Sequence, residues 1–193
     1  MTDSSSPLTT VIQSEAQPIY LRTPALSDTA ALQVIFSKPA NVEFDASARR
    51  TPPTTEGITS MITAMRDGAA ASPPTRANLV IVSAATDDVI GIAGLGRIRT
   101  RDGGTREGNA GVLLNPEWRG PTEALRMSVK FGFRRLGLDE VGVGTLEINE
   151  RMVKVMDRLG WEGKRQLDED GTREVVYLKL RSEWEVWKEK AER

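Results

Sequence analysis

The sequence contains no cysteine and no histidine among its 193 residues. Without cysteine, disulfides, thiolate nucleophiles and zinc sites with thiolate ligands are excluded. Without histidine, the chain lacks the commonest general base and metal ligand of enzymes. If the protein is an enzyme, its proton transfers must therefore use carboxylates, lysine, tyrosine, the backbone or water.

Long apolar runs and an excess of one charge are missing as well. No stretch is long and apolar enough to cross a bilayer, and the formal net charge is −1, so we expect neither a membrane nor a nucleic acid as partner. Residues 1–17 are polar and do not have the pattern of a signal peptide, so we expect a disordered tail on a cytoplasmic protein. The composition, 39% hydrophobic and 27% charged, is that of a globular protein, and we expect residues 18–193 to form one domain.

The first half of the chain alternates between strand and helix patterns. Alternation of apolar and polar residues indicates strands, and apolar residues at helical spacing indicate helices. The elements predicted in this way are a strand over 19–23, helices over 29–36 and 54–66, and strands over 78–84 and 89–98. The intervening loops, 38–53 and 68–77, carry no readable pattern.

Three glycines, Gly91, Gly94 and Gly96, lie inside the strand over 89–98. Glycine weakens a strand and usually marks a bulge or the close approach of another backbone or a ligand. No helix opens directly after this strand, so its glycines are not a dinucleotide-binding fingerprint. Arginines cluster around the Asp102-Gly103-Gly104 turn that follows. Acidic residues interleave with them, which favours a solvated hairpin over a phosphate-binding patch.

The most informative stretch runs from Gly108 to Leu136. Ala110–Leu114 is a short apolar strand, and Asn115-Pro116 closes it with a turn. Arg119-Gly120-Pro121 then opens a helix, because proline suits the first helical position. The unpaired N–H groups at the start of such a helix form a ready anion-binding site.

A strand–helix–strand crossover completes this unit. Val141–Glu147 is the next strand, and its spacing predicts that it runs parallel to Ala110–Leu114. Asn149 then suits the N-cap of another helix. Two closing strands follow that helix, the first from Trp161 to Leu167 and the second from Thr172 to Leu180.

Two segments resemble the GCN5-related N-acetyltransferase (GNAT) superfamily, and most closely its ribosomal-protein N-terminal acetyltransferase branch. The first is Arg119-Gly120 followed by Thr122-Glu123-Ala124-Leu125, and the second is Asn149 to Trp161. The resemblance extends over about residues 19–184. It implies an α+β fold with a central mixed, mostly antiparallel sheet of about seven strands flanked by helices.

The resemblance also implies a site for acetyl-CoA as co-substrate. In the family, a bulged strand matching Ala110–Leu114 splays from the strand matching Val141–Glu147, and its unpaired N–H groups hold the thioester carbonyl. The Arg-Gly turn binds the pyrophosphate, and the asparagine contacts the pantetheine arm or the acceptor. The residues assigned to acetyl-CoA in this way are Val112, Leu113, Leu114, Arg119, Gly120, Pro121, Thr122, Glu123 and Asn149.

The general base is less clear from the resemblance. The family often places a glutamate near the start of the thioester-binding strand, where this chain has Asn109. Glu107 lies two residues earlier on the same side of the strand and is the candidate base, acting through a water. The alternative is that Glu107 is a surface residue.

The chain departs from the family pattern at the pyrophosphate turn. About three residues are missing there, including the second glycine, and only Pro121 separates the two halves of the motif. Met152 replaces the usual serine, and the tyrosine that often acts as general acid is absent.

Two functions stay open. The first is an N-acetyltransferase acting on a small primary amine or a protein N-terminus. The second is a catalytically inactive binding or regulatory protein, acting as a homodimer, that has lost CoA binding. An unrelated α+β domain is the third alternative.

Overall fold

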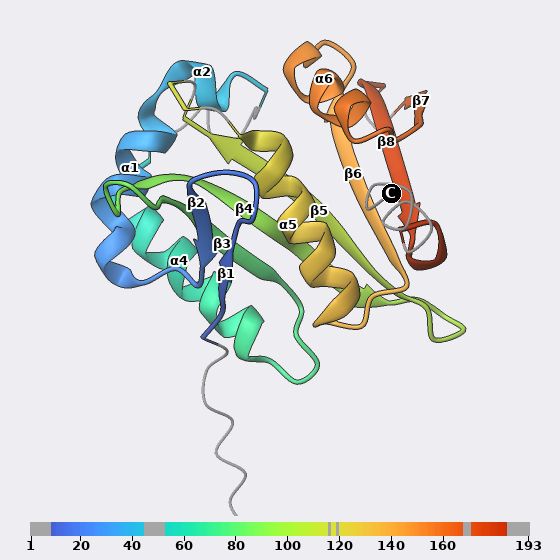
Figure 1. Cartoon of the computed structure of the whole chain (residues 1–193), viewed down its shortest axis with the longest axis horizontal. Helices are drawn as coiled ribbons and strands as arrows, with labels where there is room; N and C mark the ends of the chain where they lie inside the picture. The colour runs from blue at the N-terminus through green and yellow to red at the C-terminus, as the bar shows by residue number, and fades with distance from the viewer. Residues whose placement is uncertain (1–8, 45–52, 116, 119, 168–170, 185–193) are drawn as a thin grey trace, which may run out of the picture.

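A computed structural model describes residues 9–44, 53–115, 117–118, 120–167 and 171–184. Its centre is an eight-stranded sheet with the strand order β1-β2-β3-β4-β5-β6-β8-β7 (Figure 1). The strands are β1 (Val11–Gln13), β2 (Ile19–Arg22), β3 (Ala77–Ser83), β4 (Val89–Thr100), β5 (Arg106–Leu114), β6 (Glu140–Leu146), β7 (Gly163–Leu167) and β8 (Arg173–Leu180). Only β5 and β6 pair in parallel, so the predicted mixed, mostly antiparallel sheet and its parallel crossover are confirmed.

Helices cover both faces of the sheet. They are a 3-10 turn η1 (Leu26–Asp28), α1 (Thr29–Ser37), α2 (Pro39–Val42), α4 (Thr55–Ala70), α5 (Pro121–Arg134) and α6 (Glu150–Arg158). Buried residues of α1 and α4 pack with Val80 and Val82 of β3, and α5 packs on the opposite face against β4, β5 and β6. None of the described helices is both long and apolar enough to span a membrane.

The N-terminal segment is better ordered than its composition indicates. The expectation of a disordered tail over residues 1–17 is wrong for Val11–Gln13, which form β1 and pair antiparallel with β2. Ile12 packs against the core from this strand. A tertiary contact thus orders a polar segment as a strand. With β1, the sheet has eight strands where we expected about seven. Residues 1–8 lie outside the described part of the chain.

The glycines of β4 serve close backbone packing. A Cβ atom built on Gly91 would lie 2.4 Å from Leu113 O, and one built on Gly94 would lie 2.2 Å from Ala77 O. Gly94 also has a φ of 132°, which side chains rarely adopt. The register between β4 and β5 shifts at Gly96, so the bulge lies in β4 and not in β5, where the resemblance had implied it.

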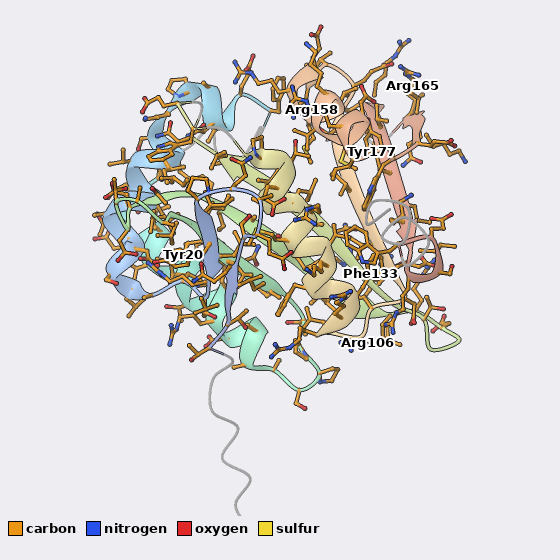
Figure 2. All side chains as sticks on the ribbon, in the orientation of Figure 1. Tyr20, Arg106, Phe133, Arg158, Arg165 and Tyr177 are labelled. Carbon is orange, nitrogen blue, oxygen red and sulfur yellow. The ribbon has the colours of Figure 1, made fainter. Side chains whose placement is uncertain are left out.

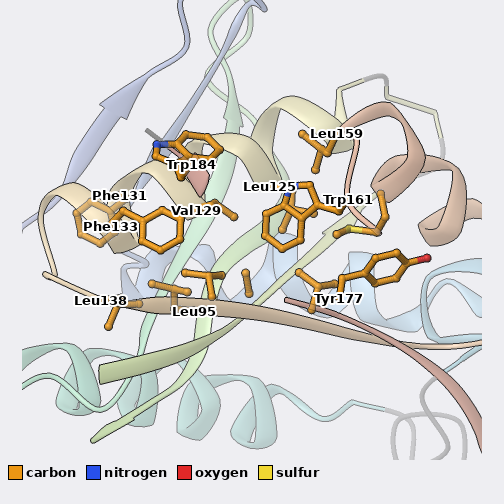
Figure 3. Packing of buried hydrophobic residues seen from close by; sticks show 14 of the residues in the cluster. Leu95, Leu125, Val129, Phe131, Phe133, Leu138, Leu159, Trp161, Tyr177 and Trp184 are labelled. Carbon is orange, nitrogen blue, oxygen red and sulfur yellow. The ribbon is translucent and has the colours of Figure 1, made fainter. Parts of the chain in front are cut away.

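One aromatic-rich cluster joins the two halves of the domain. Leu125, Val129 and Phe133 of α5 pack there with β6, α6 and β8 (Figure 3). Trp161, which we expected to begin a strand, is instead 5% exposed within this cluster. The Phe133 and Trp184 rings lie with their centroids 5.9 Å apart. This cluster fixes α5 and α6 relative to β5 and β6.

Replacing Gly94 with alanine should destabilise the fold by about 3 kcal/mol, because the new methyl group combines an unfavourable φ with overlap against Ala77 O. Urea unfolding followed by circular dichroism measures this loss. Gly96→Ala is the matched control, since its Cβ would find only Asn78 Nδ2, at 3.9 Å. Equal losses in the two variants would contradict the close-packing explanation.

Candidate functional site

The sheet divides where β5 and β6 separate. The two strands pair only at Glu107–Glu140, Gly108–Val141 and Asn109–Gly142, although β5 continues to Leu114 and β6 to Leu146. Figure 1 shows the two strands meeting at one end and diverging toward the other. We call the region beyond Asn109 and Gly142 the splay.

Backbone groups of β5 line the splay. Asn115 N donates to Ile90 O of the β4 side at 3.0 Å. In an antiparallel pair, hydrogen-bonded and non-hydrogen-bonded positions alternate, so Leu113 also bonds to β4, whereas Val112 and Leu114 do not. The N–H and C=O groups of Val112 and Leu114 therefore point toward β6, which no longer pairs with them.

Polar contacts fasten the closed end of the splay. Arg106 lies at the C-terminal end of α5 (Figure 2), and its guanidinium donates to Leu136 O. Its backbone N–H donates to Asp139 Oδ2 at 2.9 Å, and Asp139 N donates back to Arg106 O at 2.8 Å. Arg181 Nε donates to Leu138 O at 2.8 Å from the end of β8. These contacts set the point at which β5 and β6 begin to diverge.

The start of α5 lies at the other end of β5. Gly120 is the N-cap residue, with φ 115° and ψ 19°, and no side chain of the described chain caps the helix. Pro121 has no N–H, so the donors in the first turn are the backbone N–H groups of Thr122 and Glu123. These donors and the helix dipole suit an anion. Arg119 lies outside the described residues.

The turn between β5 and α5 is anchored from the α1 side. Lys38 Nζ donates to Asn115 Oδ1 and to Glu117 Oε1, each at 3.0 Å. Trp118 is partly buried against the core, and its N–H donates to Asn115 O. These contacts hold Asn115, Glu117 and Trp118 against the α1 side of the domain.

Asn149 lies where the chain passes from β6 into α6. It follows β6 and caps α6, with Oδ1 accepting from Met152 N at 3.2 Å and Nδ2 donating to Thr145 Oγ1 at 3.0 Å. The predicted N-cap is therefore confirmed. The carbonyl oxygen of the amide has a second lone pair, so it can still accept a hydrogen bond from a ligand.

A family model described as "Acetyltransferase (GNAT) domain" matches residues 19–162, more than half of the chain. The chain belongs to the GNAT acetyltransferase family. The predicted family is therefore confirmed, and the splay and the α5 start lie within the matched range. A search of curated proteins finds no match.

Solved structures share this fold. RimJ from Mycobacterium smegmatis, in complex with CoA-disulfide, has a TM-score of 0.73 at 16% identity, with 93% of this chain and 90% of that chain covered. RimL, a ribosomal L7/L12 α-N-protein acetyltransferase in complex with coenzyme A, gives 0.73 at 13% identity, covering 89% and 98%. A ribosomal-protein-S5-alanine acetyltransferase from Vibrio fischeri gives 0.72 at 16% identity, covering 91% and 98%. At these identities the likeness is one of fold.

The GNAT site residues predicted from the sequence fall into two groups. Val112 and Leu114 border the splay, Asn149 lies between β6 and α6, and Gly120 to Thr122 form the start of α5. Leu113 is partly buried and packs toward α1, α4 and β3, with its backbone committed to β4. The side chain of Glu123 points elsewhere, and only its backbone N–H faces the turn.

Glu123 is tied to the N-terminal segment. The residue is 7% exposed, and its carboxylate accepts hydrogen bonds from Arg126 at 2.8 and 2.9 Å and from Ser14 Oγ at 2.7 Å. Burial raises the pKa of the Glu123 carboxyl, but the hydrogen bonds from Arg126 and Ser14 outweigh burial, and the net pKa is lowered. Sequence reasoning missed this contact because Ser14 lies in a polar segment 109 residues away.

Glu107 lies at the closed end of the splay. Its carboxylate is ion-paired with Arg99 and with Arg101, the latter at 2.7 Å. Arg101 also pairs with Glu140 of β6. Among the described residues, no group of three or more acidic side chains is placed to hold a metal ion.

Within the described part of the chain, the sheet face opposite α5 and α6 is exposed at the start of the splay. Asn109 and Gly111 of β5 are exposed on this face, and so is Gly144 of β6. A Cβ atom built on Gly111 would meet nothing within 4 Å. This part of the face is therefore open among the described residues.

The lowered pKa of Glu123 predicts how stability depends on pH. Glu123 contributes stability above its unfolded pKa, near 4.5, and this contribution is lost as the pH falls through the lower folded value. As the pH falls below 4.5, the unfolding free energy should fall more steeply for the natural protein than for Glu123→Gln. Glu150→Gln, which alters an exposed carboxylate, is the control. A slope that Glu123→Gln leaves unchanged would refute the prediction.

Proposed function

We propose that the protein transfers an acetyl group from acetyl-CoA to a primary amine. The observation that carries this proposal is the splay: β5 pairs with β6 at three positions only, and the N–H groups of Val112 and Leu114 are left without a strand partner in the described chain. Such preorganised donors suit the carbonyl oxygen of a thioester, where negative charge develops during acyl transfer.

The start of α5 supports a phosphate site beside the splay. The N–H groups of Thr122 and Glu123 and the helix dipole favour an anion there, and Asn149 borders the region in which the connecting arm would lie. The thioester of bound acetyl-CoA supplies the activated acetyl group. The protein would hold acetyl-CoA through β5, Gly120 to Glu123 and Asn149.

The acceptor would enter from the exposed face of the sheet. A neutral amine can attack a thioester directly and needs no covalent enzyme intermediate, which suits a chain without cysteine or histidine. RimL and the Vibrio fischeri protein are named as acetyltransferases of ribosomal proteins, and this supports a protein N-terminus as one acceptor class. A small primary amine is the other.

A second function, binding without catalysis, is favoured by the short turn. Pro121 lacks an N–H where a longer turn would supply donors. A charge-assisted hydrogen bond to phosphate contributes about 1.5–3 kcal/mol, so two missing donors would weaken CoA binding by about a hundredfold or more. This reading predicts a GNAT fold that works as a regulatory or binding module.

Calorimetric titration with acetyl-CoA, CoA and dephospho-CoA separates the two functions. Micromolar binding is the expected result, and an acceptor screen with small amines and N-terminal peptides follows it. Absence of heat and of thermal stabilisation at millimolar acetyl-CoA would overturn the transferase and favour the binding module.

Replacing Val112 with proline tests the role of the splay directly. Its N–H does not bond to β4, so proline removes the donor and leaves that ladder intact. We expect kcat to fall by about 10²–10³-fold, as for loss of one oxyanion donor. Val112→Ala removes the side chain but keeps the N–H, and its kcat should stay within about tenfold. Equal kcat in the two variants would show that the donor is not used.

Glu107 stays a candidate base, but its position counts against it. The splay begins at Ala110, three residues along the strand, or about 10 Å at 3.3 Å per residue. A base must reach the amine directly or through one water. We therefore expect Glu107→Gln to change kcat no more than Glu140→Gln does, since both variants remove an ion pair with Arg101. A loss of about 10²-fold or more for Glu107→Gln alone would identify it as the base.

A further inference from the structure

A groove of about 300 Å³ lies between β1 and α5, away from the splay. Its walls are the β1 strand with its neighbours on one side and the solvent-facing side of α5 on the other. Figure 1 shows β1 running alongside α5. Two contacts hold the segment after β1 to the helix: Ser14 donates to Glu123 at 2.7 Å, and Lys130 Nζ lies 3.6 Å from Glu15 Oε1.

The backbone on the β1 side is available for hydrogen bonding. Thr23 N donates to Thr10 O, and Ser14 N donates to Ile19 O, so the even-numbered residues bond to β2. By the alternation of antiparallel pairs, the N–H and C=O groups of Val11 and Gln13 point away from β2. Since β1 is the first strand in the sheet order, it is an edge strand, and such unpaired edges accept further strands.

The α5 side of the groove is cationic. Arg126, Lys130, Arg134 and Arg135 line it, together with the carboxylates of Glu15 and Glu123. Arg126 is bound to Glu123. Arg134 and Arg135 are exposed, and neither has an ion pair or a side-chain hydrogen bond in the described chain. The groove therefore carries an excess of two positive charges beside the open strand edge.

We propose that this groove binds an extended acidic peptide, which adds a strand to β1 and directs carboxylates toward Lys130, Arg134 and Arg135. The strand edge supplies main-chain hydrogen bonds, and the cations select the side chains. Val11, which is 57% exposed, offers an apolar contact to alternate residues of the peptide. The groove meets the acetyl-transfer site of the proposed function only at Glu123, whose carboxylate lines the groove and whose N–H belongs to the first turn of α5, and the proposal does not depend on that function.

Two other occupants fit less well. A second copy of the chain would have to pair through its own β1, which lies beside its own α5. It would therefore bring the same cations toward Lys130 and Arg134. A small anion would use the cations but would leave the backbone edge of Val11 and Gln13 unused. An extended acidic chain uses both features.

The test is fluorescence anisotropy with a labelled hexapeptide of alternating valine and glutamate. The peptide is acetylated at its N-terminus, so it is no acceptor for acetyl transfer. We expect saturable binding that weakens with added salt. We expect at least about tenfold weaker binding for Arg134→Glu, which reverses a charge beside the ligand. Arg158→Glu makes the same charge change on exposed α6 (Figure 2) and should bind as the natural protein does.

Further arms test the strand addition itself. Gln13→Pro removes an outward N–H while keeping the bonds to β2, so it should weaken binding about tenfold. N-methylation at alternate residues removes every second N–H donor of the peptide. Binding should weaken when the methylated residues are those whose N–H groups face β1. Equal binding of the methylated peptides, or of a valine–lysine peptide, would overturn the proposal. Displacement of the peptide by acetyl-CoA would overturn it too, and so would a dimer in sedimentation in place of peptide binding.

Discussion

The short parallel contact between β5 and β6 is the constraint on which the rest of the structure depends. Three residue pairs join the two strands, and beyond them each strand keeps a full ladder only with its outer neighbour, β4 or β8. A buried backbone group without a partner costs about 1–3 kcal/mol, so the strands stay apart only because other contacts hold each of them. The Arg106–Asp139 contacts hold the closed end, and the cluster around Phe133 and Trp161 holds α5 and α6 against their strands.

Helix α5 connects three parts of the protein. Its inner side fills the core between the halves of the sheet through Leu125 and Val129, and its first turn presents N–H groups beside the splay. Its solvent side carries the cations that border β1. Glu123 lies in the first turn of α5, and its carboxylate accepts a hydrogen bond from Ser14, which follows β1. The order of the N-terminal segment is therefore coupled to the helix end at which an anion would bind.

The order of the strands from β2 to β8 could be predicted from the sequence, whereas α2 (Pro39–Val42) lies in a segment that we expected to be a loop. Gly120-Pro121 and Asn149 mark helix starts by local chemistry, and α5 and α6 begin there. Features that depend on distant partners were not predictable. β1 forms because Ile12 reaches a core built by residues far along the chain, and Lys38 finds Asn115 only when α1 packs on the sheet. Glycine spacing indicated close approach in β4, but only the register places the bulge at Gly96.

The turn before α5 shows that the fold and the affinity for an anion are separate properties here. Pro121 fixes its own φ, and Lys38 and Trp118 contact the turn from the protein side. Fewer N–H donors than in a longer turn would then weaken binding without loosening the fold. Two such donors amount to about 3–6 kcal/mol, or about 10²–10⁴ in affinity. Because that difference leaves the splay and the core unchanged, a transferase and a pure binding protein on this scaffold would differ in their affinity for acetyl-CoA and not in their architecture.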